Sequence, residues 1–378
     1  MSAILEGSIL TPQGYVRGRL RLAGDRIGAI EGQPCPPDEA REGRALILPG
    51  FVDLHVHGGG GADTMEAGEA ALVLARLHAR HGTSALLATT MTAPMSDIEA
   101  ALRALSPHCG PEGRRARGAA RILGVHLEGP YISPDKLGAQ PAFQRPPSLD
   151  EILALNTLAP IRLVTLAPEV AGNLALIPQL VAAGMRVQIG HTEARYEQSL
   201  QALQAGASSF AHLFNAMSPM HHRAPGTVGA ALAHAEQAEL IPDLLHVHPG
   251  AIQVALRAVP GLYAVTDATA AAGMPDGAYR LGRQTVHKCL GGVRLADGTL
   301  AGSTLTMDQA LRNLVSIGLT VADASARVSA HPARYLGLSD RGRLEAGAWA
   351  DAVVLDPGGL TLQRVIIEGE EIDLANAA

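Results

Sequence analysis

Short apolar runs alternate along most of the chain with longer stretches in which Ala and Leu recur at helical spacing. Short apolar runs are typical of buried parallel strands, and the longer stretches are typical of amphipathic helices. Repeated strand and helix pairs predict a parallel sheet with helices packed outside it. We expect eight strands, at about 51–57, 83–90, 121–128, 161–168, 186–191, 207–212, 239–246 and 262–267, and helices at 69–82, 149–159, 174–184 and 196–206.

Eight such repeats favour a closed (β/α)8 barrel of the TIM type, an α/β fold. The rival is an open doubly wound sheet, but no Gly-x-Gly-x-x-Gly segment follows the first strand, so its dinucleotide-binding version has no support. At both ends of the chain the pattern changes to brief alternating runs separated by Gly, Pro and Asp. Because such segments are too short to fold alone, we predict a small β-sandwich domain made by residues 1–48 and 336–378, and a catalytic barrel at 49–335.

Composition adds exclusions. The 378 residues are 47% hydrophobic and 17% charged, and 36 acidic residues against 30 basic ones give a formal charge of -6. This balance argues against general binding to nucleic acid or to an anionic membrane, since both need a positive field. Cys35, Cys109 and Cys289 are far apart, which indicates neither a disulfide framework nor a thiolate zinc site. Since the N-terminus shows no basic segment followed by a long apolar one, we expect a cytoplasmic protein that is neither secreted nor membrane-spanning.

Candidate chemistry lies where the predicted strands end, because reactive side chains of such a barrel project from the carboxyl ends of its strands. The first strand ends in His55 and His57, and the period of two along a strand turns both imidazoles to the same inward face. A single His there is more often a hydrogen-bonded structural residue, whereas two at this spacing, followed by glycines 58–61, favour a metal site. Further strand tips carry Glu128, His191, His212 and Asp267.

Imidazoles with carboxylates suit zinc, iron, cobalt or manganese, so these strand tips point to metal-dependent hydrolase chemistry. Taken singly, Glu128 could equally be a helix-capping or surface carboxylate, and the combination is what favours the metal. His126, two residues before Glu128 and on the same face of its strand, is expected to pack beneath the site rather than bind the ion.

A specific resemblance is carried by the strings LPGFVDLHVHGGGG, GVHLEGPYIS, IGHTEA, AHLFNAM, VTDATAAAG and LAGSTLTM. In order and spacing they resemble those of the N-acetylglucosamine-6-phosphate deacetylases of the amidohydrolase superfamily, over nearly the whole chain. The resemblance implies a divalent metal ion, zinc before iron, cobalt or manganese, held by Glu128, His191 and His212. It also implies Asp267 as the catalytic acid and base. A second ion on His55 and His57 stays open, because some relatives lack this pair and hold one metal.

The same resemblance implies hydrolysis of the N-acetyl group of N-acetylglucosamine 6-phosphate to glucosamine 6-phosphate and acetate, by a homodimer. Arg223 is expected to contact the phosphate, in its own subunit or a neighbouring one, and a guanidinium can bind a phosphate bidentately. The other implied substrate contacts are Ala139, Gln140, Asn215, Ala216, His246, Leu300, Ala301 and Gly302.

Position 140 departs from the family pattern. The family usually has Lys-Gly-Ala-His on this loop, and this chain ends the same stretch in Gly138, Ala139 and Gln140. A Gln amide donates a hydrogen bond but cannot become a cation, so stabilisation of the oxyanion or the preferred acyl sugar could differ. N-acetylgalactosamine 6-phosphate and other N-acyl amino sugars therefore stay open as substrates. A non-catalytic amidohydrolase-like scaffold is the remote alternative, disfavoured because the expected ligands and Asp267 are all retained.

Overall fold

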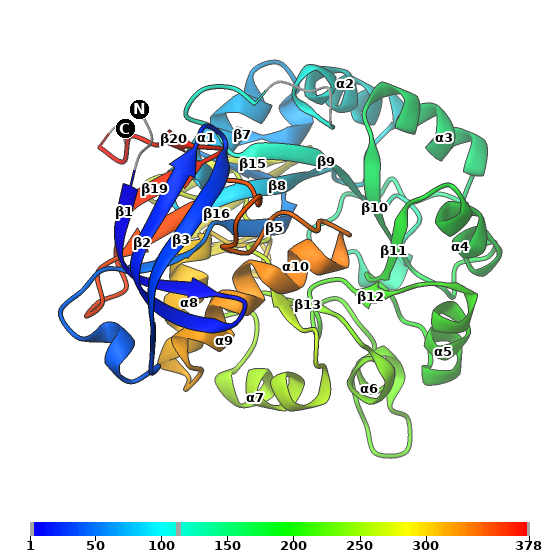
Figure 1. Cartoon of the computed structure of the whole chain (residues 1–378). Coiled ribbons are helices and arrows are strands. Elements are labelled where there is room, and N and C mark those ends of the chain that lie inside the picture. Colours follow the sequence, from blue (N-terminus) through cyan, green and yellow to red (C-terminus); the bar gives the residue numbers. More distant parts are fainter. Residues whose placement is uncertain (1–3, 111–114, 376–378) are drawn as a thin grey trace.

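Eight parallel strands form the centre of the molecule (Figure 1), in a computed structural model that describes residues 4–110 and 115–375. Each strand lies within one of the ranges predicted from the sequence, so the predicted α/β barrel is confirmed. The strands are β5 (Phe51–Val56), β8 (Thr83–Thr89), β9 (Arg121–Glu128), β10 (Ile161–Leu166), β11 (Arg186–Ile189), β12 (Ser209–Phe210), β13 (Glu239–Leu240) and β14 (Tyr263–Ala264).

Backbone hydrogen bonds close these strands into a ring. Six of them form one sheet in the order β12-β11-β10-β9-β8-β5, and β13 pairs with β14. The N–H of Leu213 donates to the carbonyl of Glu239 at 2.8 Å, which joins the end of β12 to β13. The N–H of Asp267 donates to the carbonyl of His55 at 2.9 Å, which joins the end of β14 to β5. All eight carboxyl ends therefore meet at one end of the barrel, where its reactive groups are expected.

Helices surround the barrel, and the four predicted from the sequence are all present: α1 (Ala70–Arg80), α3 (Leu149–Leu158), α4 (Asn173–Ala182) and α5 (Tyr196–Ala205). Ser148 caps α3, since its hydroxyl accepts the N–H of Glu151 at 3.2 Å. In the described parts of the chain, no helix combines the length and apolar character needed to cross a membrane. The other helices are α2 (Met95–Leu105), α6 (Gly226–His234), α7 (Pro249–Ala258), α8 (Met307–Ser316), α9 (Val321–Val328) and α10 (Ala330–Tyr335).

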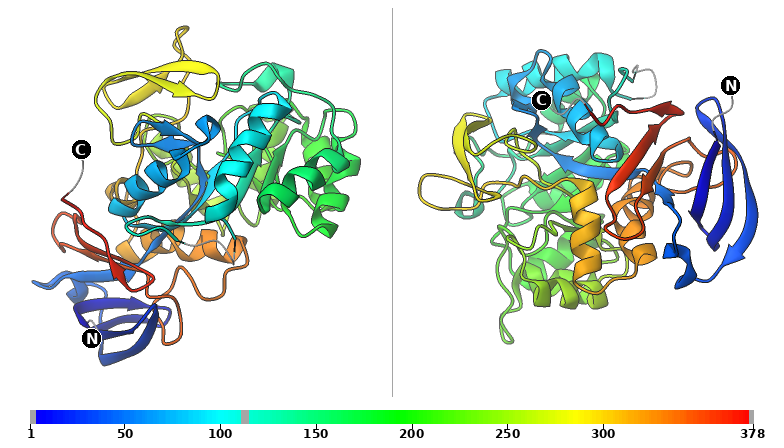
Figure 2. Two further views of the ribbon diagram at one scale, coloured as in Figure 1. Left: turned by 90° about the horizontal axis from the view of Figure 1, so that it is seen from above. Right: turned by 90° about the vertical axis from the view of Figure 1, so that its left-hand side faces the viewer.

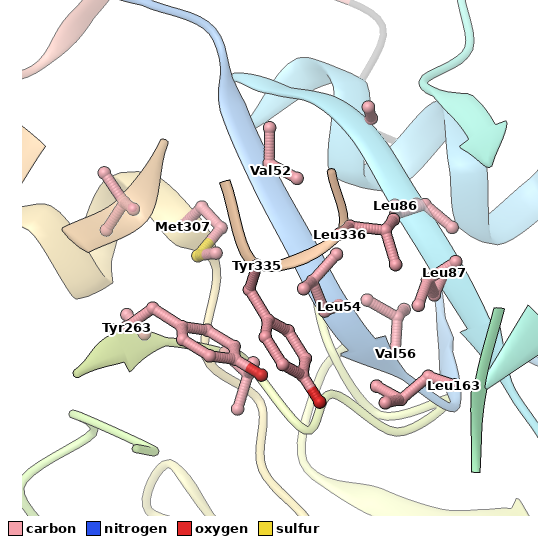
Figure 3. Packing of buried hydrophobic residues seen from close by; sticks show 14 of the residues in the cluster. Val52, Leu54, Val56, Leu86, Leu87, Leu163, Tyr263, Met307, Tyr335 and Leu336 are labelled. Atoms are coloured by element: carbon pink, nitrogen blue, oxygen red, sulfur yellow. The ribbon is translucent and has the colours of Figure 1, made fainter. Parts of the chain in front are cut away.

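Buried apolar side chains pack along the barrel strands β5 and β8 (Figure 3). Tyr335 and Leu336, at the end of α10, pack beside Leu54 of β5, and the ring of Tyr335 stacks on Tyr263 with 5.5 Å between centroids. Burying an apolar side chain of this size contributes about 1.5–3 kcal/mol. This packing holds the strands in place and so sets the positions of the side chains at their carboxyl ends.

Both ends of the chain meet in one seven-stranded sheet, as predicted. Its order is β20-β19-β18-β4-β1-β2-β3, and β18 pairs with β4 in antiparallel register. The predicted sandwich is formed by one continuous sheet, which curls around its own apolar core. The curled sheet is held by the N–H of Ile27 in β3, which donates to the carbonyl of Ala348 before β18 at 2.9 Å. The strands are β1 (Ile4–Thr11), β2 (Gly14–Ala23), β3 (Arg26–Cys35), β4 (Leu46–Pro49), β18 (Ala352–Leu355), β19 (Leu362–Ile367) and β20 (Glu370–Glu371).

A third sheet, not predicted from the sequence, is formed by the segment that connects β14 to α8 in the sequence. It consists of β15 (Gly277–Leu281), β16 (Gln284–Cys289) and β17 (Gly292–Arg294), paired as antiparallel hairpins. Figure 2 shows it in yellow on the side of the barrel away from the terminal sheet. Gly282 and Gly291, with φ of 54° and 79°, supply the left-handed turns between its strands. These glycines, set among brief alternating runs, were the available sequence signal for this sheet.

Candidate active site

A cavity of about 340 Å³ opens at the carboxyl ends of the barrel strands. Strand tips form its floor, and the loops after β9, β12 and β17 form its walls. Most of the residues proposed from the sequence line it. They are His57, Glu128, Ala139, Gln140, His191, His212, Asn215, Ala216, His246, Asp267, Leu300 and Gly302.

Glu128, His191 and His212 form the first of the groups that could hold a metal ion. Oε1 of Glu128 lies 3.3 Å from Nε2 of His191 and 3.1 Å from Nε2 of His212. Each Nδ1 faces a backbone carbonyl, of Lys136 at 2.8 Å and of Asn215 at 3.2 Å, and must carry the hydrogen. When both imidazoles are neutral, as metal ligands are, their Nε2 lone pairs point at each other, 3.1 Å apart, and at the carboxylate. In that form the arrangement is repulsive without a cation between the donors, so these residues fit a divalent metal ion.

A second group is formed by His55, His57 and Asp267. The two Nε2 atoms are 3.2 Å apart, and Oδ1 of Asp267 lies 3.5 Å from that of His55 and 3.3 Å from that of His57. Glu128 borders this group as well, because its Oε2 lies 3.3 Å from Nε2 of His57. The arrangement of donors thus offers two neighbouring positions that share one carboxylate.

The charges of this cluster depend on one another. Burial alone would raise the pKa of Glu128, but His55 and His191 outweigh it and hold that pKa well below its ordinary value. Burial also raises the pKa of Asp267, and the neighbouring His55 and His57 bring it down to about 2. Conversely, burial lowers the pKa of His57, whereas hydrogen bonds to Asp267 and Glu128 raise it to about 9. Both carboxyl groups are therefore ionised at neutral pH and available as metal ligands or bases.

Backbone conformation turns these side chains into the cavity. His191, His212 and Asp267 all have positive φ, at 47°, 28° and 50°. A left-handed conformation at a residue other than Gly costs about 1–3 kcal/mol and persists only where the surroundings enforce it. At Asp267 they do so through two backbone hydrogen bonds, to the carbonyl of His55 at 2.9 Å and from the N–H of Ser303 at 2.7 Å.

Gln140 lies against the first metal group rather than free in the cavity. Its Oε1 accepts the backbone N–H of Thr92 at 2.7 Å, which fixes the orientation of the amide. The NH2 group therefore donates to Oε2 of Glu128. In this position Gln140 orients a proposed metal ligand, a contact that the sequence alone did not indicate.

Two residues proposed as substrate contacts lie elsewhere. Ala301 is fully buried against Val293 of β17, so the cavity is lined by its neighbours Leu300 and Gly302 and not by Ala301 itself. Arg223 lies on an exposed loop and lines a separate hollow beside α5, with its Nη1 2.6 Å from Nε2 of His222. The structure therefore does not bring Arg223 to the cavity of its own subunit, and its contact with a phosphate, in its own or a neighbouring subunit, stays a prediction.

Sequence reasoning missed three carboxylates that support the site. Glu239, fully buried in β13, lies 3.0 Å from Nδ1 of His55, and Asp53 accepts the hydroxyl of Thr266 at 2.6 Å. Asp243 lies 2.7 Å from Nδ1 of His246, and although burial lowers the pKa of His246, Asp243 outweighs it and raises that pKa. A carboxylate within or beside an apolar strand run was the signal that could have identified Asp53 and Glu239.

Comparison with known proteins gives consistent matches over nearly the whole chain. The model of the amidohydrolase family matches residues 46–372. An N-acetylgalactosamine-6-phosphate deacetylase from Escherichia coli O157:H7 is 41% identical over 372 residues, covering 96% of this chain and 97% of that protein. An N-acetylglucosamine-6-phosphate deacetylase from Lysinibacillus sphaericus is 40% identical over 336 residues, covering 87% and 86%.

Solved structures agree. A mutant N-acetyl-D-glucosamine-6-phosphate deacetylase from Mycobacterium smegmatis, in complex with N-acetyl-D-glucosamine-6-phosphate, superposes with a TM-score of 0.89. It is 38% identical, and the match covers 98% of this chain and 99% of that one. The arrangement of barrel and terminal sheet is therefore shared with these deacetylases.

Proposed function

The chain belongs to the amidohydrolase family, and from that premise we propose that it hydrolyses the N-acetyl group of N-acetylglucosamine 6-phosphate to glucosamine 6-phosphate and acetate. The observation that carries the proposal is the convergence of Glu128, His191 and His212 with Asp267 on the floor of the 340 Å³ cavity. A volume of this size suits a small ligand, since such sites occupy about 300–1,000 Å³. The names of the relatives support the substrate.

Glu128, His191 and His212 would hold the metal ion, with a second position on His55, His57 and Asp267. A divalent ion, zinc before iron, cobalt or manganese, supplies Lewis-acid polarisation of the acetyl carbonyl and makes water a stronger acid. Asp267 is ionised and accepts the proton of the attacking water as the new carbon–oxygen bond forms. It returns the proton to the sugar nitrogen as the carbon–nitrogen bond breaks, because an unprotonated amine is a poor leaving group.

Among the described residues that line the cavity, the basic side chains outside the two metal groups are Lys136 and His246, and each already has a carboxylate partner. Nζ of Lys136 is paired with Glu193 at 2.9 Å, and His246 is paired with Asp243. Since Arg223 lies on an exposed loop outside its own cavity, we infer a homodimer in which Arg223 of the partner subunit contacts the phosphate. Arg223→Ala should then raise KM for the phosphorylated sugar strongly and leave the unphosphorylated sugar almost unaffected. Equal effects on both sugars would remove Arg223 from the phosphate site.

N-acetylgalactosamine 6-phosphate is the second candidate substrate, because the Escherichia coli relative named for it is 41% identical over 372 residues. Gln140, on the loop where the family usually carries His, favours keeping it. The three cysteines are free, which fits our prediction of a cytoplasmic location.

A panel of acylated amino sugars tests the proposal. Protein of known metal content is assayed for acetate release from N-acetylglucosamine and N-acetylgalactosamine, each with and without the 6-phosphate. We expect the highest kcat/KM for N-acetylglucosamine 6-phosphate. A higher value for the galactosamine epimer selects the second candidate, and no acetate from any sugar with metal-loaded protein contradicts deacetylation of amino sugars.

A further inference from the structure

Glu239 lies beneath the cavity, outside the sets so far given catalytic roles, and receives hydrogen bonds on both carboxylate oxygens. Its Oε2 lies 3.0 Å from Nδ1 of His55 and accepts the backbone N–H of His212 at 3.2 Å. Its Oε1 accepts an N–H of the Gln188 amide at 2.8 Å. The side chain is fully buried, and an ionised carboxylate is stable there only when such donors satisfy it. Glu239 therefore touches the side chain of one metal group and the backbone of the other.

A chain of donors fixes the direction of these bonds. The hydroxyl of Thr165 lies 2.7 Å from Nε2 of His126 and donates to Oε1 of Gln188 at 3.1 Å. The NH2 of Gln188 consequently faces Glu239 and cannot be replaced there by its carbonyl oxygen. Tyr263, whose hydroxyl Figure 3 shows directed toward the carboxyl end of β5, also donates to Glu239, at 3.5 Å. Glu239 is thus the acceptor at the end of this series of hydrogen bonds, and the hydrogen between Glu239 and His55 lies on Nδ1 of His55.

We propose that Glu239 is a positioning residue that holds His55 in its Nδ1–H form and so determines whether the second metal position is filled. With the hydrogen on Nδ1, the lone pair on Nε2 points at His57 and Asp267, 3.2 and 3.5 Å away. Fixing the tautomer of a ligating imidazole through its other nitrogen raises its basicity and orients its ring. The inference rests on the proposed function in one respect only: that His55, His57 and Asp267 form a second metal position.

The two imidazoles of this group are not equally held. Among the described residues, Nδ1 of His57 has no hydrogen-bond partner, whereas Nδ1 of His55 has Glu239. His55 is therefore the ligand whose geometry is fixed in advance. His55, His126 and Glu239 also lie close enough to hold an ion themselves, but the nitrogens of His126 are engaged by Thr165 at 2.7 Å and Thr89 at 3.4 Å, as befits a hydrogen-bond network.

Glu239→Gln tests the proposal through metal binding. An amide at this position must place its NH2 against a donor, either Gln188 or the Nδ1–H of His55, so the network that fixes His55 is disturbed. Metal-free protein is titrated with Zn²⁺ by calorimetry, and bound zinc is counted after gel filtration. We expect wild type to bind two ions, and Glu239→Gln to bind the second about 10–100-fold more weakly, with the Kd of the first within threefold. Tyr263→Phe is the matched control, because it removes a member of the network that does not touch His55, and both Kd values should stay within threefold.

Three results would overturn the inference: a wild type that binds one ion, a Glu239→Gln variant that binds both normally, or equal weakening of both ions. If the variant does not fold, metal-free wild type labelled with ¹⁵N-histidine gives the answer by NMR at a pH at which His55 is neutral, with His55 assigned from His55→Gln. A hydrogen on Nδ1 supports the inference and a hydrogen on Nε2 contradicts it. Two bound ions with the expected variant behaviour, but no acetate release from any sugar, would refute the proposed function and leave the role of Glu239 intact.

Discussion

Asp267 is the residue on which the proposed chemistry depends most. Its Oδ1 is shared between His57 at 3.3 Å and His55 at 3.5 Å, and its backbone is held by hydrogen bonds on both sides. Although burial raises the pKa of the carboxyl group, the two imidazoles lower it to about 2, so the base is ionised at every pH at which the protein is expected to work. A substitution that keeps its shape but removes the charge separates its two roles, base and ligand.

Asp267→Asn should lower kcat by at least about 10²–10⁴-fold with little change in substrate affinity, because an amide cannot accept the proton. Metal content measured on the same preparations distinguishes the roles. Unchanged metal with lost kcat identifies a proton shuttle, and lost metal with partial rescue by added zinc identifies a ligand. A near-normal kcat would contradict both.

Gln140 is the residue at which the resemblance to the family is weakest and the structure most informative. Since its amide donates to Oε2 of Glu128, the carboxylate that the two metal positions share, Gln140→Leu should weaken zinc binding about 10–100-fold, as loss of a supporting hydrogen bond does at other metal sites. Zinc titration of metal-free protein measures this. Gln284→Leu is the control, because Gln284 donates to the carbonyl of Ala139 on the same loop at 3.2 Å and does not contact Glu128. If Gln140→Leu and Gln284→Leu weaken zinc binding by the same factor, the loss comes from disturbance of the loop and not from the missing hydrogen bond of Gln140.

At the scale of elements, the sheet β15–β17 is the part of the cavity wall that the barrel does not provide. Leu281 and its neighbours Val286 and Val293 pack on Met91 and Ala271, so a small apolar core fixes the sheet against the barrel. Leu281 also lines the cavity. Loss of this core is expected to affect the wall locally, because β15, β16 and β17 form a sheet of their own that does not continue into the barrel sheet.

Leu281→Ala should destabilise the sheet by about 2–5 kcal/mol through the cavity it leaves, and should raise KM more than it lowers kcat. Hydrogen exchange should speed up in residues 277–294 while Tm changes little. Leu290→Ala is the control, since Leu290 is 92% exposed at the turn between β16 and β17 and its truncation removes no packing. Uniformly faster exchange throughout the barrel would mean that the sheet is not an independent unit.

The barrel strands were predictable because they are apolar, short and regularly spaced, and residues such as His55 and Glu128 end them. The same pattern marks Glu239 only as a carboxylate beside an apolar run. It could not show what Glu239 does, because its partners His55, Gln188 and His212 come from distant parts of the chain. Nor could it show that Arg223 lies outside its own cavity, since the loop carrying it has no periodicity that fixes its path. The local sequence pattern predicts helices and strands, whereas the composition of the site depends on contacts between helices, strands and loops that are far apart in the sequence.

At the scale of the whole molecule, a cluster of ion pairs joins the terminal sheet to the barrel. Glu368, at the end of β19, is paired with Arg341 and, at 2.8 Å, with Arg121 at the start of β9. The guanidinium of Arg341 also lies 4.5 Å from the ring of Trp349. Burial raises the pKa of Glu368, but Arg121 and Arg341 outweigh it and lower that pKa to about 2. The free energy that holds the sheet on the barrel therefore depends on pH.

The direction of this pH dependence follows from the lowered pKa of Glu368. Glu368 contributes stability that is complete above its ordinary pKa of 4.5 and is lost as the pH falls from there toward about 2. Glu368→Gln should reduce stability by about 1.5–3 kcal/mol at neutral pH, because it removes the charged acceptor that Arg341 and Arg121 share, and should flatten the loss below pH 4.5. Fluorescence of Trp349, the single Trp of the sequence, measures unfolding at the joint itself. Glu371→Gln is the control, since its pair with Arg364 is exposed and contributes little. If both variants follow the wild-type pH profile, the cluster around Arg341 does not hold the two parts together.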